Sequence, residues 1–280
     1  MKACDTFRAP AALKLRPSDA ALKLIGAAVK DGNAQLDKAE KKALDQRQTH
    51  DIIERIAELQ AMLYAQRKHK VLLILQGMDT SGKDGTIRSL FSQVNPVGIR
   101  VAAFKAPTDI EQAHDYLWRV HQQVPVKGEM TVFNRSHYES VLIERVLNLI
   151  DGAECKQRYA QIRDFERMLA ETGTVIVKIF LHISKDEQRA RLQERIDDPD
   201  KNWKFDPADI AQRKKWSEFV RLYERAIVET DTDYAPWYVV PADSKTQRNL
   251  AVAAILLETL ERLKLDWPAP KPELKGVKID

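Results

Sequence analysis

The stretch that decides the fold is Val71 to Thr86, which reads VLLILQGMDTSGKDGT. An apolar run leads into a loop with Gly77 and Gly82 that ends at Lys83, the strand, loop and helix order of a phosphate-binding P-loop, GxxxxGK. Glycines let backbone N–H groups converge on an anion, the helix N-terminus adds a favourable dipole, and the lysine adds charge. A plain glycine turn is the weaker alternative. The predicted phosphate-binding residues are Gly77, Ser81, Gly82, Lys83, Asp84, Gly85 and Thr86.

The P-loop departs from the common form at one position. Asp84 stands where Ser or Thr usually binds Mg²⁺, and Thr86 comes too late in the sequence to take that role. Asp79 lies inside the loop, where a carboxylate repels phosphate unless a cation bridges the two. We therefore expect Asp79 to organise Mg²⁺, with Mn²⁺ as the alternative ion, or to act as a catalytic acid. Asp84 is expected to be an early helical residue favoured by the dipole.

Composition narrows the class of protein. The 280 residues suit a single α/β unit with an appended arm, and 44% hydrophobic residues suffice for a sizeable core. The net charge of +4 is too small to indicate nucleic-acid binding, but it is compatible with a polyanionic substrate where cations concentrate. Cys4 and Cys155 are too few for a disulfide framework or a zinc site. No long apolar run or signal-peptide pattern occurs, so we expect a cytoplasmic protein without membrane or nucleic-acid partners.

The chain is expected to have three regions. Residues 1–45 are polar and contain Pro10 and Pro17, which predicts an N-terminal arm wrapped around the main body. Residues 46–265 are expected to form a P-loop kinase domain that begins with an amphipathic helix over 49–66. That helix docks on the core or, as the alternative, serves a dimer. Residues 266–280 are rich in Lys and Pro and predict a flexible tail.

Strands and helices alternate after the P-loop. The pattern predicts strands at 99–104, 130–133, 174–181 and 237–240. It predicts helices at 83–94, 109–123, from about 139, and at 154–172, 184–197, 207–229 and 245–263. Such alternation indicates an α/β fold, a parallel sheet flanked by helices. Ligands of such sheets bind beyond the carboxyl ends of the strands, where this P-loop falls.

A second motif, NRSHYE, follows the strand at 130–133. In P-loop folds the strand beside the P-loop strand commonly ends in an acid that organises Mg²⁺. Asn134 takes that position and can offer an amide oxygen but no charge. Arg135 follows, and its guanidinium fork suits phosphate oxygens. Both are candidate catalytic residues, whereas His137 is expected to be structural. The alternative is a capped loop with a solvated arginine.

Two further groups of cations are candidates for phosphate binding. Lys105 follows the strand at 99–104 and therefore points toward the same edge of the sheet. Residues 185–205 carry Arg189, Arg191 and Arg195, and this segment is similar to the mobile basic lid of nucleotide kinases, which closes over phosphates and excludes water. The alternative is a solvated helix whose arginines pair with neighbouring glutamates.

Together these motifs resemble the polyphosphate kinase 2 family. The matching segments are GMDTSGKDGT at 77–86, KAPT at 105–108, LWR at 117–119, FNRSHYE at 133–139, the basic lid, and APWY at 235–238. The resemblance covers roughly residues 45–265 and implies a fold like that of thymidylate kinases. It also implies Mg²⁺-dependent, reversible transfer of phosphoryl groups between inorganic polyphosphate and nucleotides.

The resemblance extends to single residues. Asp79 and Lys83 match the functional residues of the family's P-loop, Asn134 and Arg135 match its second motif, and the three lid arginines match its lid. Asn134 replaces the Asp of many members. The FNRSHYE form is similar to the subgroup, class III, that accepts both AMP and ADP. Adenine nucleotides, with guanine nucleotides as an alternative, and a homo-oligomeric state as dimer or tetramer are therefore expected.

Two rival functions remain open at this stage. One is a nucleotide kinase that uses ATP as the phosphoryl donor. The other is a P-loop ATPase or polyanion-binding module that hydrolyses or binds without transfer. The missing acid at Asn134 and the lack of an obvious water-positioning glutamine argue against hydrolysis.

Overall fold

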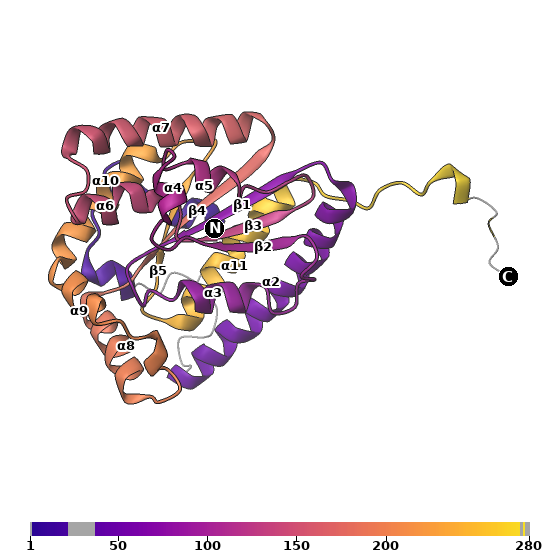
Figure 1. Cartoon of the computed structure of the whole chain (residues 1–280). Helices are drawn as coiled ribbons and strands as arrows, with labels where there is room; N and C mark the ends of the chain where they lie inside the picture. Colours follow the sequence, from indigo (N-terminus) through magenta and orange to yellow (C-terminus); the bar gives the residue numbers. More distant parts are fainter. Residues whose placement is uncertain (1, 22–36, 275–276, 278–280) are drawn as a thin grey trace.

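A parallel five-stranded sheet forms the centre of the computed structural model, which describes residues 2–21, 37–274 and 277. The strands are β1 (Lys70–Gln76), β2 (Ile99–Ala103), β3 (Met130–Asn134), β4 (Thr174–His182) and β5 (Trp237–Pro241), and their order is β2-β3-β1-β4-β5. β1 lies in the middle and is buried on both faces, which is why it reads as an unbroken apolar run. The P-loop therefore starts from the centre of the sheet (Figure 1).

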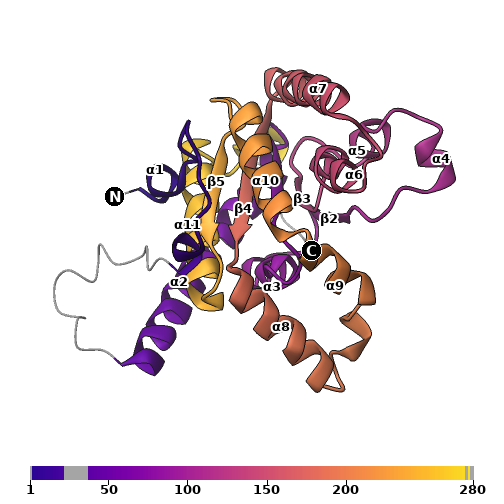
Figure 2. The same cartoon turned by 90° about the vertical axis from the view of Figure 1, so that its left-hand side faces the viewer.

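Helices cover both faces of the sheet (Figures 1 and 2). One face carries α2 (Lys38–Gln66), α3 (Lys83–Leu90) and α11 (Lys245–Arg262). The other carries α7 (Gly152–Glu171) and α10 (Trp216–Thr230). The predicted α/β fold is confirmed, with its P-loop between the central strand and α3.

The start of the chain differs from its sequence-based prediction. α2 begins at Lys38 rather than near residue 49, because Asp37 and Glu40 form a capping box at its first turn. In the described part of the arm, α1 (Ala3–Phe7) packs on α11 and η1 (Pro17–Ala21) packs beside β5. The rest of the predicted arm, residues 22–36, lies outside the described residues, as does most of the predicted tail beyond η6 (Pro272–Leu274).

Two predicted helices are broken. The stretch 109–123 forms α4 (Asp109–Gln112) and α5 (Trp118–His121), because the Asp115 carboxylate accepts from the N–H groups of residues 117 and 118 and starts a new turn. The stretch 207–229 forms α9 (Pro207–Lys214) and α10, which separate at Lys215. α9 is tied to the lid through Arg213, whereas α10 packs on α7. Packing on different elements therefore divides the helix.

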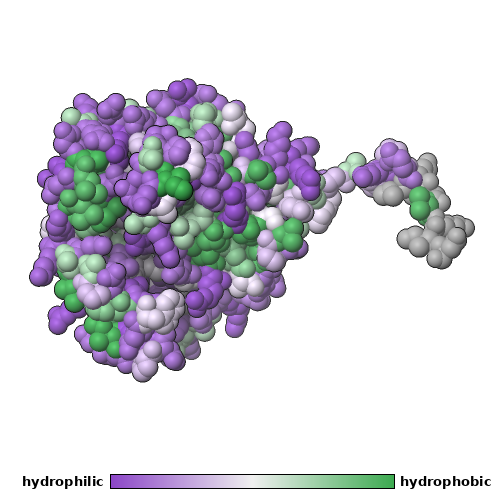
Figure 3. Space-filling view, in the orientation of Figure 1, coloured by the Kyte–Doolittle hydropathy of each residue, from purple (hydrophilic) through white to green (hydrophobic). Residues whose placement is uncertain are grey.

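The lid and the second motif are also built from short pieces. The lid consists of α8 (Lys185–Asp197) and η5 (Asn202–Lys204), and it projects with α9 at the bottom of Figure 2. The second motif enters η4 (His137–Val141), followed by α6 (Ile143–Val146), where one longer helix was predicted. The face in Figure 3 is mostly hydrophilic. None of the helices in the described ranges has the length and apolarity needed to cross a membrane.

A buried ion pair fixes the second motif to the core. The Lys178 ammonium on β4 lies 2.6 Å from a carboxylate oxygen of Glu166 on α7, and both side chains are fully buried. Glu166 also accepts from the Tyr138 hydroxyl at 2.8 Å and lies 3.1 Å from His137 Nε2. Burial opposes the charge of Glu166, but Lys178 and His137 outweigh it and lower the pKa of this carboxyl. The predicted structural role of His137 agrees with this position.

Replacing Lys178 alone should destabilise the protein. Lys178→Met leaves a buried carboxylate without its cation, and breaking such pairs costs about 3–5 kcal/mol. Urea unfolding measures this loss. The double variant Lys178→Met with Glu166→Gln should recover a large part of it, because neither charge then remains buried. Unchanged stability of the single variant would contradict this account of the core.

Candidate phosphate-binding site

A cavity of about 510 Å³ lies at the carboxyl ends of β1, β2 and β3, between the P-loop and the lid. Most predicted site residues line it, namely Asp79, Gly82, Lys83, Asp84, Gly85, Lys105, Asn134, Arg135, Arg191 and Arg195. Three lysines also line it: Lys201 and Lys204 from the predicted basic lid, and Lys245 from the start of α11, which the sequence analysis missed. The cavity therefore combines an excess of cations with three carboxylates, those of Asp79 and Asp84 in the P-loop and of Glu194 on α8, which lines both this cavity and the neighbouring hollow.

Lys83 is drawn back onto its own loop. Its ammonium is buried and donates to the carbonyl oxygens of Gly77 at 2.8 Å and Met78 at 3.2 Å. Burial and the neighbouring Arg135 charge lower its pKa to about 8. No carboxylate of the described ranges, 2–21, 37–274 and 277, pairs directly with this lysine, and a bound phosphate offers it the opposite charge that the loop carbonyls lack.

Three predicted phosphate-binding residues of the P-loop, Gly77, Ser81 and Thr86, do not line the cavity. Ser81 and Thr86 are fully buried, and neither lines it. The Ser81 N–H donates to Met78 O, and its hydroxyl lies so close to Gly77 that a Cβ there would come within 2.6 Å. Thr86 Oγ1 lies 3.5 Å from Asn249. Their placement supports the loop's shape rather than direct contact with a ligand in the cavity.

The second motif meets the P-loop across the cavity. Asn134 at the end of β3 donates through Nδ2 to Asp84 at 2.6 Å, which leaves its amide oxygen for a ligand. Arg135 adopts a left-handed backbone conformation, φ 61°, that is costly for a non-glycine residue. Removal of the Arg135 guanidinium from water disfavours its charged form. The negative charges of Glu139 and Asp79 have the larger effect and raise its pKa. The strained backbone holds a charged guanidinium at the cavity wall.

Asp79 is bound by an arginine of the lid. Arg195 Nη1 lies 3.1 Å from Asp79 and 3.6 Å from Asp209 on α9. Burial and the Asp79 charge raise the pKa of Asp209 to about 6. Asp209 was missed because it follows Pro207 in the pattern of an ordinary helix start. The two carboxylates repel each other, and Arg195 is the cation that now separates them.

The other two lid arginines behave differently from each other. Arg191 uses its donors on Glu187, Thr80 O, Ala242 O and Asp243 O, which leaves at most one of its five N–H groups for a ligand. Arg189 is exposed and does not line the cavity. The lid therefore presents Arg195 and its lysines to the cavity, and Arg191 mainly holds the P-loop.

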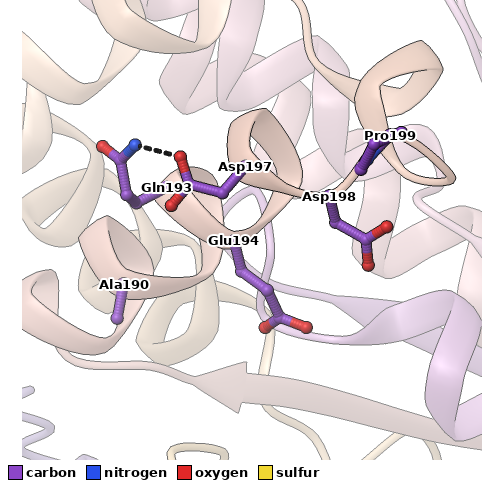
Figure 4. A pocket seen from close by; sticks show the side chains of 6 residues that line it. All are labelled: Ala190, Gln193, Glu194, Asp197, Asp198 and Pro199. Atoms are coloured by element: carbon purple, nitrogen blue, oxygen red, sulfur yellow. Dashed lines mark hydrogen bonds between the residues drawn. The ribbon is translucent and has the colours of Figure 1, made fainter.

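A second, larger hollow of about 640 Å³ lies at the end of α8. Figure 4 shows its acidic lining, with Asp197 turned toward Gln193 and away from the carboxylates of Glu194 and Asp198. Both Glu194 and Asp198 pair with Lys201 at 2.7 Å. An acidic surface repels polyanions, so we assign phosphate binding to the smaller, cationic cavity.

The P-loop, the parallel sheet and the cationic cavity define a P-loop phosphotransferase. The family model described as Polyphosphate kinase 2 (PPK2) matches residues 38–267, and the chain belongs to this family. The resemblance noted from the motifs is thereby confirmed, as is the class of enzyme, a kinase that transfers phosphoryl groups.

Similar proteins support the same family. The chain is 56% identical over 226 residues to the AMP/ADP-polyphosphate phosphotransferase of Meiothermus ruber, covering 81% of this chain and 85% of that protein. It is 46% identical to the ADP-polyphosphate phosphotransferase of Rhodopseudomonas palustris, covering 79% and 80%. The crystal structure of polyphosphate kinase 2 from Arthrobacter aurescens TC1 superposes with a TM-score of 0.84 at 41% identity, covering 97% of this chain and 93% of that one.

The ionisation of Lys83 should appear in ligand affinity. Only its protonated form attracts phosphate, so the affinity for tripolyphosphate should fall as the pH rises through about 8 toward 9. Lys83→Arg keeps the charge and should remove this fall, whereas Lys83→Ala should lower transfer about 10²–10³-fold at neutral pH. Calorimetric titration across this pH range tests the point. A pH dependence equal in wild type and Lys83→Arg would contradict it.

Replacing Arg195 should change the apparent affinity for Mg²⁺ and the turnover in opposite directions. Arg195→Ala leaves Asp79 and Asp209 without their cation, so the apparent Mg²⁺ affinity should rise while turnover falls by about tenfold or more. Arg189→Ala is the matched control on the same helix and should change neither value. Turnover at a series of Mg²⁺ concentrations gives both numbers. Equal effects of the two substitutions would show that Arg195 has no special role.

Proposed function

We propose that this chain transfers phosphoryl groups from inorganic polyphosphate to AMP and ADP, giving ADP and ATP, in a reversible, Mg²⁺-dependent reaction. The observation that carries the proposal is the cationic cavity at the P-loop, which is lined by Lys83, Lys105, Arg135, Arg195 and three lysines from the lid and α11. A polyanion is attracted to a cavity in which cations are concentrated in this way. The names of the relatives from M. ruber and R. palustris support polyphosphate and adenine nucleotides as substrates.

The residues of the cavity can perform this transfer mainly by positioning and charge. Phosphoryl transfer needs little proton chemistry, so the largest contribution is stabilisation of negative charge on the moving group. Gly82 and Lys83 hold phosphate oxygens at the helix N-terminus, and Arg135 can bind two oxygens from the opposite wall. The lid, through Arg195 and Lys204, can cover the bound chain and exclude water.

The donor groups at the cavity suit Mg²⁺. Mg²⁺ is usually held by one or two carboxylates together with substrate phosphates and water, rather than by a full cage of protein ligands. Asp79 and Asp209 supply two carboxylates, and burial together with the Asp79 charge raises the pKa of Asp209 to about 6. We infer that Asp79 holds the ion, with Asp209 beside it and the Asn134 amide oxygen within the same cavity. When bound, the metal supplies charge neutralisation for the reacting phosphates.

The rival donor is ATP, and the rival outcome is hydrolysis. Incubating the protein with AMP, polyphosphate and Mg²⁺ and separating the nucleotides by ion exchange tests the proposal. We expect ADP and then ATP to appear, with little orthophosphate. Product only when ATP replaces polyphosphate would favour the nucleotide kinase, and orthophosphate without new nucleotide would favour an ATPase or binding module.

Asp79 should be required for the use of metal rather than for binding of the anion. Asp79→Asn keeps the size of the side chain but removes its charge, so the Mg²⁺ concentration needed for half-maximal turnover should rise about tenfold or more, while tripolyphosphate affinity stays within about twofold. The control Asp197→Asn removes an exposed lid carboxylate outside the cavity and should change neither. An unaltered Mg²⁺ dependence in Asp79→Asn would remove Asp79 from the metal site.

The cellular location and the oligomeric state of the protein are also part of the proposal. AMP, ADP and polyphosphate as substrates favour the cytoplasm as the place of action. The predicted homo-oligomer, a dimer or tetramer, also remains a proposal, and light scattering coupled to size exclusion determines it directly.

A further inference from the structure

Arg248 lies directly behind the P-loop, a position that no pattern in the sequence indicates. It belongs to the first turns of α11 and is only 3% exposed. Its Nη1 donates to Ser81 O at 3.2 Å, and a Cβ on Gly82 would come within 1.8 Å of the same nitrogen. The guanidinium therefore occupies the space that the absent side chain of Gly82 leaves open.

This contact sets the direction of one P-loop N–H group. Ser81 O and the Gly82 N–H belong to one planar peptide unit and point in opposite directions. Because Arg248 holds Ser81 O, the Gly82 N–H is turned away from Arg248, toward the side on which Gly82 lines the cavity. Within the described chain, no protein acceptor takes this N–H. Arg191 binds the preceding carbonyl, Thr80 O, at 2.9 Å, so two guanidiniums hold consecutive peptide units.

The charge of Arg248 is poorly compensated in the ligand-free protein. Its Nε and Nη2 each donate to the neutral amide oxygen of Asn249, and among the described residues no carboxylate forms an ion pair with it. Arg191, in contrast, has Glu187 at 2.8 Å. Burial and the nearby Arg191 charge lower the pKa of Arg248 to about 10. The first turn of α11 contains no acid, and a helix N-terminus disfavours cations.

The buried positive charge of Arg248, which is unfavourable in the ligand-free protein, attracts an anion bound in the cavity. A phosphate on the cavity side of Gly82 lies across a single peptide unit from the guanidinium, with few intervening atoms to screen the attraction. We propose that Arg248 is a positioning residue for the polyphosphate substrate, which aims the Gly82 N–H and contributes charge to the phosphate site from behind the P-loop. The inference rests on the proposed function, because it takes a phosphate chain as the ligand.

Two uncharged substitutions of Arg248 distinguish the effect of its charge on ligand binding from the effect of its packing on stability. Arg248→Met removes the buried charge and the contact to Ser81 O, whereas Arg248→Gln removes the charge but keeps a donor of similar polarity. Both should retain the melting temperature of the ligand-free protein or raise it, because an uncompensated buried cation is lost. Both should weaken tripolyphosphate binding at least tenfold. In turnover assays the KM for polyphosphate should rise more than kcat falls.

The test is calorimetric titration with tripolyphosphate together with thermal melting with and without it. The control Arg100→Met removes a half-buried arginine on β2 that pairs with Glu129 outside the cavity, and it should leave the affinity unchanged. Affinity of Arg248→Gln within twofold of wild type would overturn the inference, as would a lower melting temperature with unchanged affinity. If Arg248→Met fails to fold, Arg248→Gln decides. Wild type that does not bind tripolyphosphate would instead refute the proposed function.

Discussion

Several positive charges lie close together around the P-loop, and their mutual repulsion determines how the neighbouring elements must be arranged. Lys83, Arg135, Arg191 and Arg248 all lie in or against the P-loop region, and the pKa of Lys83 is lowered by burial and by Arg135. Like charges at such distances repel each other, so the fold must hold them in place by other means. It does so with carbonyl oxygens of the loop, with rigid neighbouring helices, and with a buried ion pair that fixes the second motif. An anion bound at this site would compensate the excess positive charge around the P-loop.

In the lid, by contrast, positive side chains are paired with carboxylates. Arg195 reaches Asp79, so in the ligand-free protein a lid cation already occupies the position between two carboxylates. Binding of Mg²⁺ would compete with this arrangement and release Arg195 toward phosphate. Within the lid, the carboxylates of Glu194 and Asp198 at the end of α8 likewise pair with the ammonium of Lys201. Opposite charges are thus paired at the lid of the ligand-free protein.

Much of this organisation follows from local sequence. The P-loop, the order of strands and helices, and the NRSHYE segment depend on short-range patterns, and residues at the carboxyl ends of parallel strands meet at one edge of the sheet. Asp209, Lys245 and Arg248 could not be found in this way. Each lies in the first turn or turns of a helix far along the chain, and only tertiary packing brings it to the cavity or the loop. Arg191 shows the reverse case, because its place was predicted but its donors are already used by backbone carbonyls.

The most direct measurement of the central claim is a crystal structure of the protein with tripolyphosphate and Mg²⁺. The account predicts phosphate groups in the cavity between the P-loop and Arg135, with the Gly82 N–H donating to a phosphate oxygen. It also predicts that Lys83 Nζ leaves the carbonyl oxygens of Gly77 and Met78, which it now contacts at 2.8 and 3.2 Å, to bind phosphate. Tripolyphosphate bound elsewhere, with Lys83 still on those carbonyls, would contradict the assignment of this cavity as the polyphosphate site.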